Sequence, residues 1–322
     1  MKQFISLIFY VFIFSVFISC TNTPPVITPC VPLDKTGTII PEEKNAYSPS
    51  AEWEQYWYDG KAELTSYNLK QSRYGEIHDG NVVNVFVTED FSKVKQVKLD
   101  EPEKAGSDRL PVLKLNQSFK FITGIYPYSM MLSAFSPVDI NQYPHPVKIT
   151  ASSQEWCGSS FFQLNNRNKQ YQVELRSYFE KENDQDLKLD QVLLEDEWWN
   201  IIRINPEQLP TGTHIVLPGA LYLRLSHKTI SAVKAQLSII QKDSTTFFTV
   251  VYPQLNRTLS INFENKFPYT ILGWSDSFAG LDGKILTTTA TRNKMIMTDY
   301  WRKHLNIDRK LREDLGLPEN KE

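Results

Sequence analysis

The chain has 322 residues, a formal net charge of −2, and a composition that is 41% hydrophobic, 22% charged and 12% aromatic. This balance is typical of a globular protein and excludes a disordered or fibrous chain. With 35 basic and 37 acidic residues, the surface lacks the positive field that holds a phosphate backbone, so nucleic-acid binding is disfavoured. A mean hydropathy of −0.36 excludes a protein with many membrane spans.

The first 19 residues have the pattern of an export signal. Lys2 supplies one positive charge, and residues 4–18 form an apolar run that only two serines interrupt. This run is shorter than the roughly 20 residues that a permanent transmembrane helix needs. We therefore expect residues 1–19 to be a cleaved signal peptide rather than a signal anchor.

Cys20 follows this segment directly, after Phe17, Ile18 and Ser19. The arrangement resembles the lipobox of bacterial lipoproteins, whose cysteine is acylated and becomes the mature N-terminus. That pattern usually has leucine where this chain has Phe17, and the looser form resembles lipoproteins of Bacteroidetes. The resemblance implies a membrane anchor of several acyl chains, including palmitate, on Cys20. Neither an aspartate nor an acidic cluster follows Cys20, which implies the outer membrane and its periplasmic face.

Residues 20–50 are rich in proline and threonine and predict an extended tether. One remaining cysteine, Cys30, lies in this tether, and the other, Cys157, lies further along the chain. In an oxidising periplasm these two could form a disulfide, whereas a buried, unpaired thiol at Cys157 is the commoner outcome. Residues 51–322 contain no clear linker and predict a single globular body.

The body is expected to be mainly β, an antiparallel sheet or half-open barrel with one internal helix and a C-terminal helix. Short segments that alternate apolar and polar residues recur between turn residues. The expected strands are residues 61–73, 81–88, 94–99, 110–125, 126–138, 147–156, 159–164, 171–179, 214–217, 221–225, 233–240, 246–252, 258–263 and 285–291. Three-to-four spacing of apolar side chains predicts helices at 191–202 and 299–315. Residues 51–58 predict a short helix or an entry strand, and residues 74–80 have turn chemistry, with Asp79–Gly80 favouring a positive φ.

The sequence contains neither a phosphate-binding glycine motif nor a zinc-protease motif, and its five histidines are far apart. No metal or cofactor is therefore expected. An acidic stretch around Asp184 has Leu189 where a calcium loop needs glycine, which favours a solvated loop. Residues 273–277 lack the second glycine of a nucleophile elbow, and Cys157 has no histidine near it in the sequence.

Aromatic residues are the strongest positive signal. The chain contains 7 Trp, 15 Tyr and 18 Phe, more than a small sheet core requires. Some are expected to fill the core, and others to line a concave surface that binds a lipid, a glycan or a partner segment. The candidate ligand-facing residues are Trp53, Trp57, Trp156, Trp198, Trp199 and Trp274.

Ser244 lies in a short motif, Asp243-Ser244-Thr245, between two expected strands. The motif resembles the acceptor for O-glycosylation in Bacteroidetes periplasms. The resemblance predicts a sugar on Ser244.

Several strings of the body resemble one family of uncharacterised Bacteroidetes lipoproteins whose members are often labelled septum formation inhibitor Maf. These strings are residues 56–63, 73–76, 86–89, 124–131, 153–158 and 271–274, within a resemblance over residues 50–317. Maf proteins proper are cytoplasmic α/β nucleotide pyrophosphatases with a Ser-x-Arg-Arg motif near the start. This chain lacks that motif and begins with an export signal, so no Maf residue or activity is carried over.

Two functions of different classes remain. The first is a non-catalytic envelope lipoprotein that binds a lipid, a glycan or a protein partner through an aromatic-lined β surface. The alternative is a periplasmic hydrolase or transferase whose candidate carboxylates are Glu76, Glu89, Glu155 and Glu195. An enzyme would bring carboxylates together in a pocket with shifted pKa values, whereas a binding protein would present an apolar groove or patch.

Overall fold

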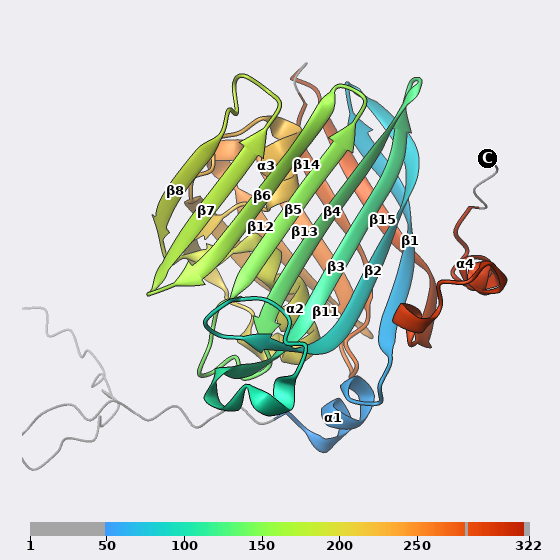
Figure 1. Ribbon diagram of the computed structural model, residues 1–322. Helices are drawn as coiled ribbons and strands as arrows, with labels where there is room; N and C mark the ends of the chain where they lie inside the picture. Colours follow the sequence, from blue (N-terminus) through green and yellow to red (C-terminus); the bar gives the residue numbers. More distant parts are fainter. Residues whose placement is uncertain (1–48, 281–282, 319–322) are drawn as a thin grey trace, which may run out of the picture. The chain divides into compact units, whose positions relative to one another are not determined.

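The computed structural model describes residues 49–280 and 283–318 (Figure 1). The described residues belong to one compact unit. The expected signal peptide, the acylated Cys20 and nearly all of the tether lie outside the described residues. No helix in the described part of the chain is long and apolar enough to cross a membrane.

The described residues form one sheet of fifteen strands, which confirms the expected mainly β fold. Strand order follows chain order except at the middle, where β1 pairs with β15. All neighbouring strands are antiparallel except β9 and β10, which are parallel. The strands are β1 (Ala62–Arg73), β2 (Glu76–Ser92), β3 (Arg109–Thr123), β4 (Tyr126–Pro137), β5 (Lys148–Glu155), β6 (Gly158–Arg167), β7 (Gln170–Ser177), β8 (Gln185–Asp190), β9 (Leu193–Leu194), β10 (Gly212–Leu217), β11 (Val233–Lys242), β12 (Thr245–Tyr252), β13 (Arg257–Glu264), β14 (Ile271–Ala279) and β15 (Ile285–Thr298).

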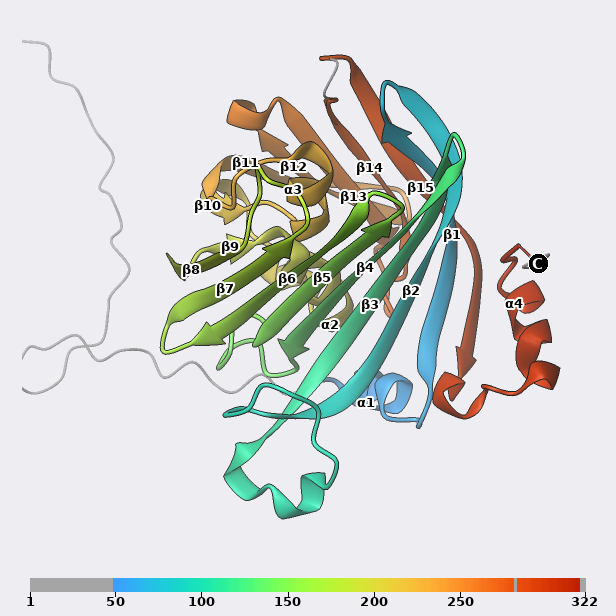
Figure 2. The same cartoon turned by 45° about the horizontal axis from the view of Figure 1, so that its top comes forward.

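The sheet curls around two short helices and so resembles a barrel (Figure 2). Its edge strands, β8 and β9, are not joined by a ladder of backbone hydrogen bonds within the described residues, so the barrel stays open there. The α-helices are α1 (Ala51–Trp57), α2 (Trp198–Ile204), α3 (Ala220–Ser226) and α4 (Lys310–Asp314). Short 3-10 helices are η1 (Pro102–Lys104), η2 (Gly106–Asp108), η3 (Glu195–Glu197), η4 (Pro206–Gln208), η5 (Pro253–Leu255), η6 (Tyr300–Arg302) and η7 (Asn306–Arg309).

Alternation along the strands produces the interior. In β12, Phe248, Val250 and Tyr252 are buried, whereas the residues between them are more exposed. Every residue of α2 is also buried, because this helix lies inside the curled sheet. Burying one large apolar side chain contributes about 1.5–3 kcal/mol, so the alternation and α2 together supply most of the core.

The structure corrects four sequence expectations. Residues 221–225 were expected as a strand but belong to α3, because a run of leucines and tyrosine suits a buried helix as well as a strand. Residues 94–99 contain only an isolated bridge between Phe91 and Lys98. The expected helix at 191–202 begins as β9 and η3, and α2 starts only at Trp198. The expected helix at 299–315 is divided into η6, η7 and the short α4.

The first hairpin turn lies within its expected segment, residues 74–80, but at the start of that segment. Tyr74 and Gly75, rather than Asp79 and Gly80, form the turn between β1 and β2, with φ angles of +53° and +75°. Gly80 lies within β2, where a Cβ atom would collide with the Lys120 carbonyl of the neighbouring strand. This glycine is therefore required by close packing and not by a turn.

Candidate functional site

One end of the barrel, where α1 precedes the start of β1, is closed by packed side chains; we call it the closed end (Figure 1). Trp53 donates its indole N–H to the Arg203 carbonyl at 3.0 Å. The Arg203 guanidinium is fully buried and forms two hydrogen bonds with the Glu63 carboxylate, of which the Nη1–Oε1 bond is 2.8 Å. The rings of Trp57 and Phe86 lie 5.1 Å from the guanidinium carbon. These contacts make the closed end part of the core.

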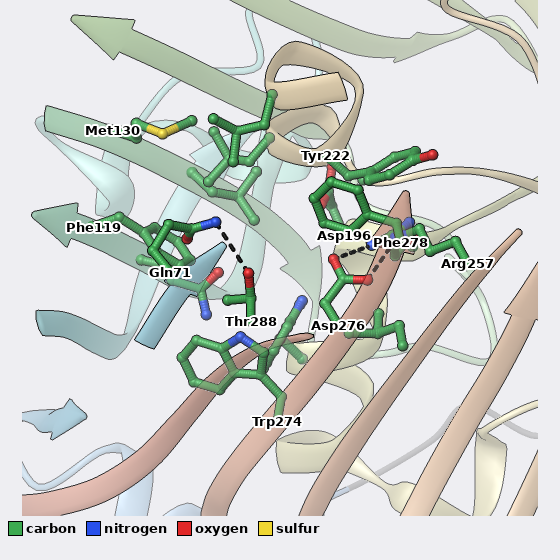
Figure 3. A pocket seen from close by; sticks show the side chains of 18 residues that line it. Gln71, Phe119, Met130, Asp196, Tyr222, Arg257, Trp274, Asp276, Phe278 and Thr288 are labelled. Atoms are coloured by element: carbon green, nitrogen blue, oxygen red, sulfur yellow. Dashed lines mark hydrogen bonds and ion pairs between the residues drawn. The ribbon is translucent and has the colours of Figure 1, made fainter. Parts of the chain in front are cut away.

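A cavity of about 80 Å³ lies in the interior between α2 and α3 (Figure 3). Phe119 of β3 and Met130 and Leu132 of β4 form an apolar wall, and Trp274 and Phe278 of β14 also line the space. The cavity is smaller than the ~150 Å³ apolar cavity that admits benzene in a well-studied mutant lysozyme. It therefore has room for a small group or the end of a longer molecule.

The opposite wall carries a buried ionic cluster centred on Arg257. Its Nη1 and Nη2 donate to Glu195 at 2.6 and 2.7 Å, and its Nε and Nη2 donate to Asp276 at 2.8 and 2.9 Å. Tyr252 donates its hydroxyl to Glu195 at 2.7 Å, and the guanidinium carbon lies 3.8 Å from the ring centre of Tyr222. Although burial lowers the pKa of Arg257, the two carboxylates outweigh it and raise that pKa well above its ordinary value. One cation thus holds two anions, leaving a net charge of −1.

Asp196 adds a third carboxyl group to this wall. It accepts the Ala220 backbone N–H at 2.9 Å, at the start of α3. Burial and the nearby charge of Glu195 raise the pKa of Asp196 to about 7, because both disfavour its ionised form. Gly219 lies against the two carboxylates, where a Cβ atom would come within 2.5 Å of a Glu195 oxygen. The wall is therefore acidic, and its charge changes near neutral pH.

Polar side chains from the sheet complete the lining. Gln71 donates to the Thr288 hydroxyl at 3.1 Å and to the Ser72 carbonyl at 3.0 Å. Gln117 is buried, and its side-chain Nε2 has no hydrogen-bond partner. A buried donor left without a partner costs about 1–3 kcal/mol. Gln117 therefore offers an unused donor to an acceptor placed in the cavity.

The six tryptophans expected to face a ligand are separated by the fold. Trp199 and Trp274 line the cavity, with ring centres 5.1 Å apart and planes at 83°. Trp53, Trp57 and Trp198 are buried in the core, and Trp156 is exposed in the turn between β5 and β6.

The four carboxylates expected for an enzyme do not converge. Glu195 lines the cavity, whereas Glu89 pairs with Lys114 at 2.6 Å. Glu155 pairs with Arg224 at 3.3 Å, and Glu76 is exposed at the start of β2.

Sequence reasoning did not find Arg257 and Asp276. A signal was present: Arg257 has the inward phase of β13, two residues before buried Leu259, and Asp276 lies between inward-facing Trp274 and Phe278. A charged residue at an inward position of a strand indicates a buried partner.

The remaining expected sites can be placed only in part. The described residues contain no group of three or more His, Cys, Asp or Glu that could hold a metal ion. Cys157 is a free thiol but is exposed, so the expectation that it is buried is wrong, and Cys30 lies outside the described residues. Ser244 is exposed in the turn between β11 and β12, and its glycosylation stays a prediction.

Comparison with known proteins gives little. No family model matches the chain, and no curated protein matches it. A solved structure that it resembles is a β-barrel-like protein of the domain of unknown function DUF1849 from Brucella abortus, with 7% identity and a TM-score of 0.44. The match covers 74% of this chain and 98% of that chain. A likeness this distant carries no argument about function.

Proposed function

We propose that the protein is a non-catalytic binding protein that takes the amine head of an amphipathic molecule into its interior cavity. The observation that carries the proposal is the juxtaposition of two walls. The Arg257 cluster is net negative, and Phe119, Met130 and Leu132 opposite it are apolar. A protonated amine with an attached hydrocarbon chain matches both walls.

The charge of the cluster decides between head groups. Both carboxylate partners of Arg257 already occupy its donors, so a ligand carboxylate or phosphate would meet repulsion from Glu195, Asp276 and Asp196. A sugar would leave many hydroxyl groups unpaired against the apolar wall. A small ammonium group meets opposite charge, and its size suits a cavity of about 80 Å³. It leaves the Gln117 donor unpaired, because an ammonium group donates hydrogen bonds and cannot accept them.

One observation favours the enzyme alternative, a hydrolase or transferase. Asp196 has a pKa of about 7, which suits a general acid near neutral pH. Its partner would be Glu195 or Asp276, the other two carboxylates that line the cavity. Both accept hydrogen bonds from Arg257, and Glu195 accepts one from Tyr252 as well. Because both carboxylates are already held by these donors, binding is the better supported role.

Titration with three ligands of equal chain length tests the proposal. The protein is the chain from residue 21 to 322, which keeps every described residue, and the signal is the fluorescence of Trp199 and Trp274. We expect decylamine to bind, 1-decanol to bind more weakly, and decanoate not to bind. The W199F/W274F double variant is the control for the signal. Equal binding of all three ligands, or tightest binding of decanoate, would contradict the proposal.

The protonation state of Asp196 sharpens the test. Lowering the pH from 8 to 5.5 neutralises this carboxyl and weakens decylamine binding by about tenfold, if the added charge contributes about 1.4 kcal/mol. The Asp196→Asn variant removes the pH dependence and leaves 1-decanol binding unchanged. The neighbouring Glu195 and Glu197 raise the pKa of Asp196, and Arg257 lowers it. These three residues must therefore be unchanged in every variant used for the pH titration.

We also propose that acyl chains on Cys20 hold the protein on the periplasmic face of the outer membrane. The support is the sequence alone: an apolar leader, the lipobox-like cysteine and a proline-rich tether. Labelling with tagged palmitate should mark the wild-type protein and not a Cys20→Ala variant, and that variant should leave the membrane fraction. An unlabelled wild-type protein would refute this anchor.

A further inference from the structure

We propose that the end of the barrel opposite the closed end docks on the surface of a zwitterionic phospholipid bilayer. The contact is made by Tyr74, Ile125, Tyr126, Trp156 and Tyr178, which we call the hairpin row. This docking surface goes beyond the proposed function and does not depend on which molecule enters the cavity.

The hairpin row lies at one end because of the strand directions. The turns that join β1 to β2, β3 to β4, β5 to β6 and β7 to β8 all lie at the top of Figure 1. Each of these four turns exposes at least one large apolar or aromatic side chain. Ile125 is 79% exposed, Trp156 68% and Tyr178 69%. Large apolar residues this exposed on adjacent turns indicate a binding surface.

Contacts between the turns make the row continuous. The Tyr126 hydroxyl donates to the Tyr74 hydroxyl at 3.0 Å, which links the first two hairpins. The rings of Tyr126 and Trp156 are stacked with centres 6.3 Å apart, which links the second and third. The ring of Tyr178 covers Gly158, where a Cβ atom would lie 2.5 Å from a ring carbon, and so links the fourth. The row is therefore a single surface.

The backbone conformation of Tyr74 fixes the position of its side chain in the row. Tyr74 has a φ of +53°, a left-handed conformation that costs a non-glycine residue about 1–2 kcal/mol. The two-residue turn that Tyr74 forms with Gly75 requires this φ. In this turn the Tyr74 hydroxyl lies between those of Tyr126 and Tyr128, at 3.0 and 2.8 Å, which fixes the side chain in the row.

The chemistry of the row favours a bilayer over a protein as the partner. Tryptophan and tyrosine have an apolar ring with one polar group, and they concentrate at the boundary between lipid tails and head groups. The side chains stand on separate turns. They can insert into a deformable lipid surface, whereas a protein partner would need a surface of complementary shape. Exposed charges beside them are of both signs, with Lys120 and Lys181 against Glu76, Glu180 and Asp184. Because neither sign dominates and acidic residues are slightly in excess, the row suits zwitterionic head groups rather than a strongly anionic surface.

One residue of the row, Tyr74, also lines a cavity. A second cavity, of about 70 Å³, is lined by Arg73 and Tyr74 from the first hairpin. It shares two lining residues, Leu225 and Phe278, with the interior cavity. The two cavities therefore adjoin at Leu225 and Phe278, on the side of the molecule where Tyr74 of the hairpin row lies.

Flotation with phosphatidylcholine vesicles tests the docking surface. The chain from residue 21 to 322, which lacks any lipid anchor, should float with the vesicles at low and at high salt. In the I125S/W156S double variant the fraction of protein bound to vesicles should fall by about tenfold or more, because two apolar side chains are no longer transferred from water into the bilayer. The control is V94S/I307S, two equally exposed residues away from the row (70% and 75%), which should float like the wild type.

Quenching by brominated phosphatidylcholine locates the contact. Trp156 and Trp301 are the exposed tryptophans among the described residues, at 68% and 46%. Vesicle-dependent quenching should persist in W301F and disappear in W156F. Decylamine binding by I125S/W156S should stay unchanged, which separates failure of the docking surface from failure of the cavity.

Three results would overturn the proposal. The first is an absence of flotation with neutral vesicles, and the second is an equal loss in the V94S/I307S control. The third is a dimer, seen by analytical ultracentrifugation without lipid, that I125S/W156S dissociates, because the row would then join two copies of this chain.

Discussion

The two ends of the barrel use aromatic residues in opposite ways. At the closed end, Trp53 and Trp57 are buried around the Glu63–Arg203 pair. At the hairpin end, Trp156 and Tyr178 are exposed. The same residue type therefore serves as core at one end and as surface at the other, and position in the fold decides which. The predictions below test this contrast in order of expected effect.

The largest effect is expected at the closed end. Arg203→Met leaves the Glu63 carboxylate buried without its partner, which should lower the free energy of unfolding by about 3–5 kcal/mol. Urea unfolding at neutral pH measures this loss. The E63Q/R203M double variant is the control and should recover part of it, since no unpaired charge remains. A loss below about 1 kcal/mol would show that this pair does not secure the closed end.

An effect of similar size but with a distinct pH signature is expected at the cavity. The pKa of Asp196 is raised from 3.8 to about 7 in the folded state, so the folded protein binds a proton that the unfolded chain has released. Its contribution to stability is therefore largest below pH 4 and is lost as the pH rises through about 7, a change of about 4 kcal/mol.

Asp196→Asn should flatten this pH profile and stabilise the protein at pH 8, as measured by thermal unfolding at several pH values. His145 needs its own control because Glu197 outweighs the effect of burial and raises the pKa of that histidine. If His145→Gln flattened the pH profile as much as Asp196→Asn does, His145 rather than Asp196 would be the group whose titration changes the stability.

Gly219→Ala should have an intermediate effect. The added methyl group meets the Glu195 carboxylate, which Arg257 and Tyr252 hold in place, so overpacking should destabilise by about 1–3 kcal/mol. Decylamine binding should weaken as well. Gly212→Ala is the matched control. Gly212 has a φ of +87° and open space around its Cβ position, so this variant should lower the stability through backbone strain and leave decylamine binding unchanged.

The smallest effect on stability is expected at the hairpin row. Because Ile125 and Trp156 are exposed, I125S/W156S should change the free energy of unfolding by less than about 0.5 kcal/mol. Its effect should appear only in vesicle flotation. A large loss of stability would mean that these side chains support the fold.

The candidate site was only partly predictable. Trp199, Trp274 and Glu195 were among the expected residues, but nothing in the sequence separated them from Trp53 or Glu89. Arg257 and Glu195 are 62 residues apart in the chain, and their contact exists only because β13 and η3 meet inside the barrel. Residues this far apart cannot be paired from local spacing in a single sequence.

The sequence by itself determined the mainly β fold, because alternation with a period of two is a local property of each strand. It also predicted an export signal and a lipid anchor on Cys20, which stay predictions. The tertiary structure decided that residues 221–225 form a helix, since burial inside a curled sheet outweighs a strand-like composition. It also decided which aromatic residues are core, cavity wall or exposed row, because the curl of the sheet sets what each inward or outward side chain meets.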